Sequence, residues 1–441
     1  MVLVSKLRTV VKSLMPMAVF RLIEPFGHLL EAIIMNIRYG FPARGLHVIG
    51  VTGTNGKTTT SFMIHRMLVE AGYDVALMST VAYGVGNDIT LQEQHMTTVS
   101  SPQLLRQIKS FKKQGAKWLV LETTSHALAQ NRVWGVPYEI AVMTNITHEH
   151  LDYHRTFKRY LAAKVKLFKI ANRHGHKFGV VNADDEHAID FAKEIKNSVF
   201  YGINGGDLRA TDIQLTGEGS TYSVNINDRL HQIRCHIPGE FNVSNSLAAV
   251  AVGLELDLPI SKIISGIAAL DGVDGRMTTV DEGQDFSVIV DFAHTPDSFE
   301  RLLSDVRKST TGKLIVLFGS AGRRDESKRA IQGRIAGKYA DEVVLTEEDD
   351  RDIDGQEILN QIAGGAEESG KVRGQNLSLI LNRSEAITFA INKAAASGDT
   401  VILLGKGHEK TIERADGAHP WDEVVEVRRA LQARASRSAI G

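Results

Sequence analysis

Short apolar runs alternate with helical patterns through the first half of the chain. Apolar residues recur at helical spacing over 103–113 and 160–171. The strand-like runs around them are residues 75–78, 118–121, 140–143 and 179–181. This alternation predicts a parallel sheet covered by helices on both faces. Residues 221–226 and 231–234 instead alternate apolar with polar positions, which predicts a small antiparallel sheet attached to the same domain.

A second series of strands and helices begins near Gly272. Its predicted strands are residues 287–290, 313–317, 342–345 and 400–404, and its predicted helices are 297–306, 327–339 and 383–396. Each strand ends in a polar or glycine-rich corner, where ligands gather in open α/β sheets. The pattern predicts an α/β protein with a central domain over 47–272 and a Rossmann-like C-terminal α/β domain over 273–441.

Residues 1–46 are apolar and basic. Charged residues interrupt every long apolar run, so a membrane span is not expected, and no secretory signal is evident. Pro16, Pro25 and Pro42 are expected to divide the segment into short helical pieces. One of these pieces carries an apolar stripe of Leu29, Leu30, Ile33, Ile34 and Ile37. Two interpretations stay open: a helix packed on the main body, or peripheral contact of residues 1–40 with a membrane or a partner.

Charge and cysteine content narrow the classes of function. Lys and Arg number 51 against 52 Asp and Glu, so the overall charge gives no reason to expect nucleic-acid binding. Any anion must therefore be bound by a local site. Cys235 is the single cysteine, which excludes an internal disulfide and a cysteine-built metal site. A reducing cytoplasm fits this composition.

The sequence Gly-Val-Thr-Gly-Thr-Asn-Gly-Lys-Thr-Thr-Thr at residues 50–60 follows a strand-like run and opens a helical pattern. Strand, glycine-rich turn and helix form a phosphate-binding loop, in which Lys57 reaches the terminal phosphates and Thr58 offers a hydroxyl to Mg²⁺. The usual spacing would need glycine at Val51. The predicted nucleotide contacts are Gly53, Thr54, Asn55, Gly56, Lys57, Thr58 and Thr59.

Three further features suggest chemistry. Glu122 ends a buried strand, where a carboxylate often meets Mg²⁺, although it could also cap a helix. Residues 144–154 concentrate histidines and acids in one loop, which suits metal or phosphate contacts. Lys164 lies on a largely apolar helix face, and pattern alone favours a surface lysine there.

These motifs, in this order, resemble the Mur ligases, and most of all the MurE type. The stretches that carry the resemblance are 53–59, 122–126, 144–154, Ala162-Ala163-Lys164, 275–277, 291–297 and 405–409. The resemblance extends from about residue 47 to 430. It implies that ATP phosphorylates a substrate carboxylate, that an amino-acid amine attacks the acyl phosphate, and that phosphate leaves as an amide forms.

The resemblance also implies roles for individual residues. Lys57, with Mg²⁺ on Thr58 and Glu122, neutralises the phosphates; His150 helps to hold a second Mg²⁺; and CO₂ carbamylates Lys164, giving an anion that positions metal. Contacts to ATP are implied for Asn242, Asn245, Arg276, Asp291 and His294. Contacts to a muramoyl-dipeptide are implied for Thr97, Thr98, Ser125, Gln130 and Arg132. Contacts to the incoming amino acid are implied for Arg324, Arg351, Gly405 and Glu409.

Two departures from the family pattern affect the substrates. Members that select meso-diaminopimelate carry Asp-Asn-Pro-Arg where this chain has Glu348-Asp349-Asp350-Arg351, which leaves the amino acid undecided. Residues 1–46 are also too few for the family's UDP-sugar-binding domain, so we expect either that the remaining domains hold the nucleotide-sugar more weakly or that the acceptor is a different molecule, such as a lipid-linked one.

The expected function is therefore an ATP-dependent acid–amino-acid ligase that adds the third amino acid to UDP-MurNAc-L-Ala-D-Glu. We expect a cytoplasmic monomer with small-molecule substrates. A folate polyglutamate or cyanophycin-type ligase is an alternative, and a P-loop ATPase switch without ligase activity is a more distant one.

Overall fold

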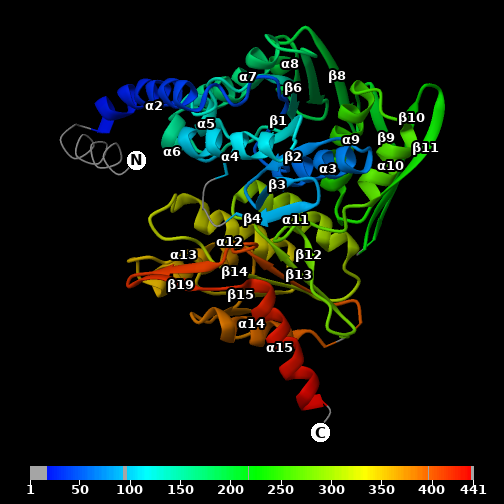
Figure 1. Cartoon of the computed structure of the whole chain (residues 1–441). Coiled ribbons are helices and arrows are strands. Elements are labelled where there is room, and N and C mark those ends of the chain that lie inside the picture. Colours follow the sequence, from blue (N-terminus) through cyan, green and yellow to red (C-terminus); the bar gives the residue numbers. More distant parts are fainter. Residues whose placement is uncertain (1–16, 93–96, 217, 396, 439–441) are drawn as a thin grey trace. The chain divides into compact units, whose positions relative to one another are not determined.

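The computed structural model describes residues 17–92, 97–216, 218–395 and 397–438. The chain forms two compact units (Figure 1). The first comprises Met1–Ile146, Tyr153–Arg209 and Leu247–Gly266, and the second comprises Thr147–Asp152, Ala210–Ser246 and Ile267–Gly441.

A mostly parallel sheet forms the core of the first unit. Its parallel strands follow the order β8-β7-β6-β1-β5-β2, and an antiparallel hairpin, β3–β4, continues it beyond β2. The strands are β1 (His47–Thr52), β2 (Val75–Met78), β3 (Ala82–Val85), β4 (Asp88–Leu91), β5 (Trp118–Glu122), β6 (Tyr138–Met143), β7 (Phe178–Asn182) and β8 (Asn197–Gly202). The parallel sheet predicted from the apolar runs is confirmed.

Helices cover both faces of this sheet. Alternate strand residues, such as Val48, Leu119 and Ala141, face one hydrophobic cluster with α4 (Ser101–Lys113), α5 (Ser125–Ala129) and α7 (Phe157–Ala171). On the other face α3 (Lys57–Glu70) packs against β1, β2 and β5 and also meets α9 (Glu240–Glu255) and α10 (Ile260–Ala268). Two short helices, α6 (Leu151–His154) and α8 (Ala188–Ala192), follow β6 and β7 in the chain.

The second unit contains a six-stranded sheet in the order β12-β13-β17-β14-β15-β16, parallel except for β12. The strands are β12 (Thr278–Thr279), β13 (Ser287–Asp291), β14 (Leu314–Phe318), β15 (Glu342–Leu345), β16 (Leu377–Leu379) and β17 (Thr400–Leu404). One face packs against α14 (Arg383–Lys393) and α15 (Glu423–Ser438). The other helices are α11 (Pro296–Ser309), α12 (Ser327–Tyr339) and α13 (Gly355–Glu368).

Helices α12 and α13 are in backbone contact. A Cβ atom placed on Gly333 would lie 2.0 Å from the Ile362 carbonyl oxygen, and one on Gly365 would lie 1.8 Å from the Ala330 carbonyl oxygen. No side chain fits at either position, so the two glycines allow the helix axes to approach closely.

Two antiparallel elements also occur. The meander β9 (Leu208–Thr216), β10 (Gly219–Ile226) and β11 (Arg229–Cys235) matches the predicted small sheet, and the first residues of β9 pair in parallel with β8. The hairpin β18 (Thr411–Arg414) and β19 (Gly417–Pro420) follows β17.

The N-terminal helix α2 (Met17–Tyr39) continues through Pro25, so the predicted division into short pieces there is wrong. Pro25 removes one helical hydrogen bond, but tertiary contacts hold the helix: Asn36 Nδ2 donates to the Trp134 carbonyl (3.0 Å) and Asn131 Nδ2 donates to the Pro25 carbonyl (3.3 Å). None of the helices in the described ranges combines the length and apolar character needed to cross a bilayer.

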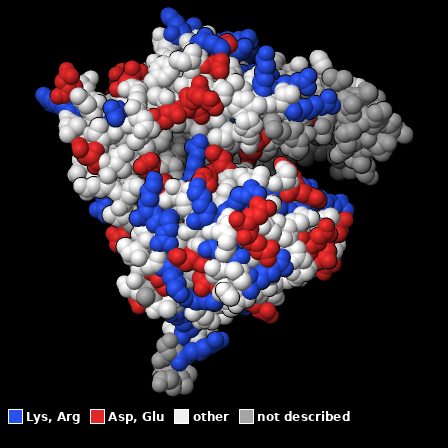
Figure 2. Space-filling view, turned by 180° about the vertical axis from the view of Figure 1, so that it is seen from behind, with Lys and Arg blue, Asp and Glu red and all other residues white. Residues whose placement is uncertain are grey.

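Charges are mixed over the surface. Figure 2 shows Lys and Arg side chains interspersed with Asp and Glu side chains on the visible face, in keeping with a formal net charge of -1. Ligand recognition by charge must therefore come from local clusters.

A buried ion pair fixes α14 and α15 to the sheet of the second unit. The Arg383 guanidinium donates to the Glu423 carboxylate (2.6 Å) and also to the Glu347 and Leu404 carbonyls (2.9 Å each), and both charged side chains are fully buried. Every group around the guanidinium is thus an acceptor, so its removal leaves Glu423 buried with only the Trp421 indole as a donor (2.7 Å).

We predict that Arg383→Leu destabilises the protein by roughly 3–5 kcal/mol, because an uncompensated buried carboxylate remains. Denaturant unfolding followed by tryptophan fluorescence measures this, since Trp421 contacts Glu423 directly. The control is Arg334→Leu, which loses an exposed pair with Glu368 and should cost below about 1 kcal/mol. Equal losses of unfolding free energy in the two variants would contradict the stabilising role assigned to the buried pair of Arg383 and Glu423.

Candidate active site

The loop between β1 and α3 has the geometry of an anion cradle. Gly56 adopts a left-handed conformation (φ 80°) directly before the helix, and a Cβ on Gly53 would lie 1.8 Å from Thr144 Oγ1. Residues at the end of β6 hold the loop: Asn145 Oδ1 accepts from the Asn55 amide (2.9 Å), and Thr144 Oγ1 donates to the Asn55 carbonyl (2.6 Å). The amides at the start of α3 are therefore preset for phosphate oxygens.

Glu122 meets this loop from the neighbouring strand. It is buried, lies opposite Val51 in the β1–β5 register, and accepts from Thr58 Oγ1 (3.1 Å) and from the Thr80 amide (2.9 Å). Thr124, not Glu122, caps α5, so the helix-cap interpretation of Glu122 is wrong. A hydroxyl beside a carboxylate is a hard-oxygen donor pair that fits Mg²⁺.

Lys164 lies on the inner side of α7. Its side chain is 1% exposed, its Nζ donates to the Gly53 carbonyl, and its ammonium lies 4.8 Å from the centre of the Tyr160 ring. Tyr160 in turn is hydrogen bonded to Thr54 Oγ1 (2.8 Å). The surface interpretation of this lysine is therefore wrong: the side chain points into the phosphate-binding loop. Lys57 Nζ donates to the Thr54 carbonyl (2.8 Å).

A hydrogen-bonded group extends from Glu122 to the residues expected to hold an acceptor. Thr98 Oγ1 donates to the Glu122 carbonyl (3.1 Å), and Arg132 Nη1 donates to the Thr98 carbonyl. Ser125 Oγ is hydrogen bonded to His154 Nε2 (3.0 Å), a residue for which the sequence suggested no specific role. Thr98, Ser125 and Arg132 are buried, whereas Thr97 and Gln130 are half-buried.

The residues expected to contact the nucleotide from the second unit are mostly buried. Asn245 Nδ2 donates to Asn242 Oδ1 (2.9 Å), and Asn242 Nδ2 donates to the Pro238 carbonyl (2.7 Å). Asp291 accepts from the Met277 and Ala293 amides (2.8 and 2.7 Å). Burial raises the pKa of Asp291, and the positive charge of Arg276 opposes this.

His294 and Arg276 both pack against Phe292. The Arg276 guanidinium lies 4.8 Å from the Phe292 ring centre, and the His294 ring lies 4.8 Å from it. Burial, helped by the positive charge of Lys328, lowers the pKa of His294 to about 4, so the imidazole is neutral near pH 7. Because a carbonyl can only accept, His294 Nδ1 donates to the Phe292 carbonyl (2.9 Å) and Nε2 is left as an acceptor.

His150 belongs to the short segment Thr147–Asp152 of the second unit. It has a left-handed backbone (φ 55°), and its Nε2 lies 3.5 Å from the Glu149 carboxylate. Within the described ranges, no three His, Cys, Asp or Glu side chains gather as a metal-binding group. A Mg²⁺ ion that keeps waters and phosphate oxygens as ligands does not need such a group.

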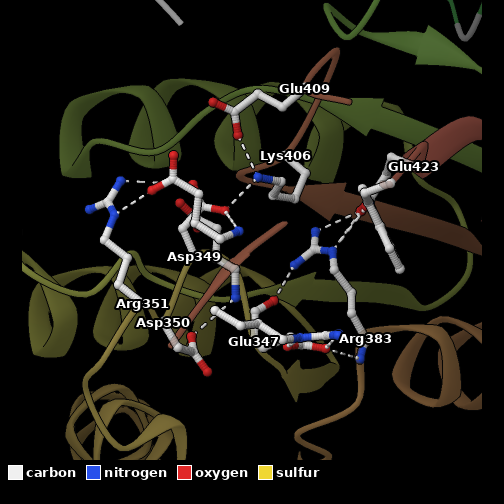
Figure 3. Close-up of polar contacts among 12 residues, drawn as sticks. Glu347, Asp349, Asp350, Arg351, Arg383, Lys406, Glu409 and Glu423 are labelled. Atoms are coloured by element: carbon white, nitrogen blue, oxygen red, sulfur yellow. Dashed lines mark hydrogen bonds and ion pairs between the residues drawn. The ribbon is translucent and has the colours of Figure 1, made fainter. Parts of the chain in front are cut away.

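A cluster of charged side chains lies where β15 and β17 end (Figure 3). Most of the acids in it have a cationic partner. Arg414 donates to both oxygens of Glu347 (2.8 Å each), and the buried ammonium of Lys406 lies between Asp349 (2.8 Å) and Glu409 (2.6 Å). Although burial opposes it, these two carboxylates leave the pKa of Lys406 raised.

Arg351 is also engaged within this cluster. Its Nε donates to Glu413 Oε2 (2.7 Å) and its Nη1 donates to the Gly322 carbonyl (2.6 Å). By contrast, the guanidinium of Arg324 is exposed and makes no hydrogen bond or ion pair with any residue in the described parts of the chain. Of the two arginines predicted to bind a carboxylate of the amino acid, Arg324 is thus exposed to a ligand, whereas Arg351 is already paired within the protein.

Glu348 differs from the other acids of the cluster in having no hydrogen-bond partner for its carboxylate within the described chain. Its side chain is buried. Burial raises the pKa of Glu348, and the positive charges of Lys328 and Lys406 oppose this. Gly405 has a left-handed backbone (φ 101°), which strains any other residue, and a Cβ there would lie 2.5 Å from Glu348 Oε2. Burial also raises the pKa of Asp350, to about 6.

Comparison with known proteins identifies two family domains in the chain. Residues 51–253 match the Mur ligase middle domain, and residues 275–407 match the Mur ligase glutamate ligase domain. A UDP-N-acetylmuramyl-tripeptide synthetase of Roseiflexus sp. is 39% identical over 407 residues, which cover 89% of this chain and 80% of the relative. The chain belongs to the Mur ligase family.

Two other relatives of this Mur ligase carry a related name. A UDP-N-acetylmuramoyl-L-alanyl-D-glutamate–2,6-diaminopimelate ligase of Bacillus licheniformis is 39% identical over 406 residues, covering 91% of this chain and 81% of the relative. A solved structure of an enzyme of that name superposes with a TM-score of 0.65 at 30% identity, covering 93% of this chain and 83% of the other.

The predicted family and fold class are confirmed. This Mur ligase is an ATP-dependent amide ligase that uses Mg²⁺ and small-molecule substrates, rather than a P-loop switch.

Proposed function

We propose that this Mur ligase adds the third amino acid to UDP-MurNAc-L-Ala-D-Glu during peptidoglycan-precursor synthesis, as a monomer in the cytoplasm. The observation that carries the proposal is the similarity, at 39% identity, to relatives whose names specify tripeptide synthesis or diaminopimelate addition to that dipeptide. The functional domains we assign are 47–272 for ATP and acceptor and 273–441 for the amino acid.

The phosphoryl step is assigned to the loop of residues 53–59. Lys57 and the amides of this loop bind the phosphates of ATP, and a carboxylate oxygen of the acceptor attacks the γ-phosphorus while the bond to ADP breaks. Mg²⁺ bound by Thr58 and Glu122 supplies charge neutralisation at this step. We also assign Asn242 and Asn245 of the first domain, and Arg276, Asp291 and His294 of the second, to the nucleotide.

The acceptor side of the site is assigned to the group around Thr98. Thr97, Thr98, Ser125, Gln130 and Arg132 bind the dipeptide, and the contact of Arg132 with the Thr98 backbone orients its guanidinium. The buried hydrogen bonds from Arg132 to the Thr98 carbonyl and from Thr98 Oγ1 to the Glu122 backbone carbonyl support placing the acceptor site beside the metal site.

We assign a carbamate to Lys164. The neutral amine attacks CO₂, an N–C bond forms, and one amine proton leaves to solvent, giving an anion that with His150 holds a second Mg²⁺. Support comes from the burial of Lys164 and from its contact with the phosphate-binding loop.

For Lys164 we predict that substitution by Ala lowers kcat roughly 100-fold or more, because transition-state charge stabilisation is lost. Removal of CO₂ and bicarbonate should slow the wild type and leave the variant unaffected. Lys169→Ala is the control on the same helix, since Lys169 is exposed and pairs with Glu194 (3.4 Å). Full activity in Lys164→Ala would remove the carbamate from the mechanism.

The incoming amino acid is assigned to the charged cluster of the second domain. Arg324 captures its α-carboxylate bidentately, and Glu348 and Glu409 bind a side-chain ammonium beside Gly405. Glu348 is a buried carboxylate without a hydrogen-bond partner in the described chain, so a cationic ligand group would satisfy it. Since Glu413 already engages Arg351, a second carboxylate on the ligand would have to displace that ion pair. We therefore assign a diamino acid with one carboxylate, such as lysine or ornithine.

The test of the whole proposal is a mass-spectrometric ligation assay with ATP, Mg²⁺, bicarbonate, the UDP-linked dipeptide and a panel of lysine, ornithine and meso-diaminopimelate. We expect a product heavier than the dipeptide by one amino acid less water, formed with lysine or ornithine, and none with Lys57→Ala. Absence of product with all three amino acids, with ATP intact, would refute the proposed acceptor.

We further predict that Glu413→Gln shifts selectivity, because Arg351 loses the closer of its two charged partners, retains Asp349 at 4.0 Å, and becomes more available to a distal carboxylate. The ratio of kcat/KM for diaminopimelate to that for lysine should rise roughly 10-fold, about the worth of one charge-assisted hydrogen bond. Glu367→Gln, which loses a surface pair with Arg373 (2.6 Å), is the matched control. An unchanged ratio in Glu413→Gln would show that Arg351 does not limit the choice.

A further inference from the structure

Helix α2 presents a line of large apolar side chains to solvent. Their exposed fractions are 47% for Ile23, 72% for Phe26, 58% for Leu30, 52% for Ile34 and 64% for Ile37. The spacing of three or four residues places all five on one side of the helix over about four turns. This helix lies outside both stretches that match the Mur ligase domains, so nothing in the family resemblance assigns it a role.

The opposite side of α2 is already used in the fold. His28, Ala32 and Asn36 are buried there, and Asn36 is hydrogen bonded to the Trp134 carbonyl. Leu29 and Ile33, which the sequence analysis placed in the stripe, are half-buried at its flank. The outward apolar line therefore contributes nothing to the folding of the described chain, and exposed patches of this extent mark interaction surfaces.

Basic residues predominate on the helix beside this stripe, whereas α2 itself carries Glu24 and Glu31, which pair with His28. Helix α4 packs beside α2, with Lys109 Nζ 5.8 Å from the Tyr39 ring centre. Its charged residues are all basic and all exposed: Arg106, Lys109, Lys112 and Lys113. This local excess contrasts with the balanced charge of the whole chain.

We propose that the outward stripe of α2, with the basic residues of α4, is an attachment surface for an anionic phospholipid bilayer. The apolar side chains enter the headgroup–acyl boundary, and the lysines and arginines lie against lipid phosphates. The helix lies along the bilayer surface and does not span it. The proposed attachment does not depend on which acceptor or amino acid the enzyme uses.

A second copy of the chain is a poorer occupant of the stripe. In a coiled coil built on Ile23, Leu30 and Ile37, opposite charges at the flanking positions normally fix the partner. Those positions hold Gly27, Leu29 and Ile34, and Asn36 is buried within its own unit. The stripe thus lacks the charge pairing that specifies a helical partner, whereas a lipid surface requires none.

The test is co-sedimentation of the full chain with phosphatidylcholine vesicles, with and without phosphatidylglycerol. Wild type should bind the anionic vesicles, and the double variant Phe26→Glu, Leu30→Glu should bind at least roughly 100-fold more weakly, because each large apolar side chain accounts for tenfold or more in partitioning. The control is Ile189→Glu with Leu230→Glu, two positions that are each 66% exposed on other elements and should leave binding unchanged.

Charge is tested by Lys109→Gln with Lys113→Gln, which should weaken binding roughly fivefold for each charge removed. Thermal melting confirms that the variants are folded, and ligation of soluble substrates should proceed at the wild-type rate, which separates this test from that of the proposed function. Equal vesicle binding by wild type and the double α2 variant would overturn the proposal. Equal binding of the wild type to neutral and to anionic vesicles would also overturn it. The proposal would likewise fail if the wild type bound no vesicles and formed a dimer that the α2 substitutions dissociate.

Discussion

The parallel register of β1 with β5 and β6 is the constraint on which the phosphate-binding half of the site depends. Val51 lies opposite Glu122, and Thr52 lies opposite Met143, so the three strands end at one edge of the sheet. The loop after β1 then lies between the Glu122 carboxylate and Asn145. A slip of one residue would turn Glu122 to the other face of the sheet and separate it from Thr58. Strand pairing, rather than the loop alone, therefore makes the site.

In the second unit, the corresponding strand end is organised by charge pairing. Five consecutive charged residues, Glu347 to Arg351, follow β15, and most of them pair with a group from a different element. Arg414 and Glu413 come from β18, and Lys406 follows β17. Such a set is stable only when nearly every buried charge is matched. Asp350 accepts only from the Glu348 amide, and the Glu348 carboxylate has no hydrogen-bond partner in the described chain, so a cationic ligand group meets the least competition at Glu348.

Much of this could be predicted from the sequence. The central strands, the phosphate-binding loop and Glu122 follow from local patterns of apolar residues and glycine, because strand positions and loop chemistry are encoded over short stretches. The burial of Lys164 could not be predicted by pattern, since it depends on how α7 lies over the loop. The pairing of Arg351 with Glu413 could not be predicted either, because β18 brings Glu413 to the loop that follows β15 only in the folded chain. The continuity of α2 through Pro25 depends likewise on distant partners, Asn131 and Trp134.

The glycine contact between α12 and α13 limits how the amino-acid site can change. Two helices that touch through backbone atoms, at Gly333 and Gly365, have no side chains there whose rotamers could absorb a tilt or a slide. Lys328, at the start of α12, and the loop that leads into α13 therefore keep a fixed spacing. A new amino-acid specificity should therefore be engineered by exchanging side chains on the loops after β15 and β17, because the contact between α12 and α13 does not allow these helices to be repacked.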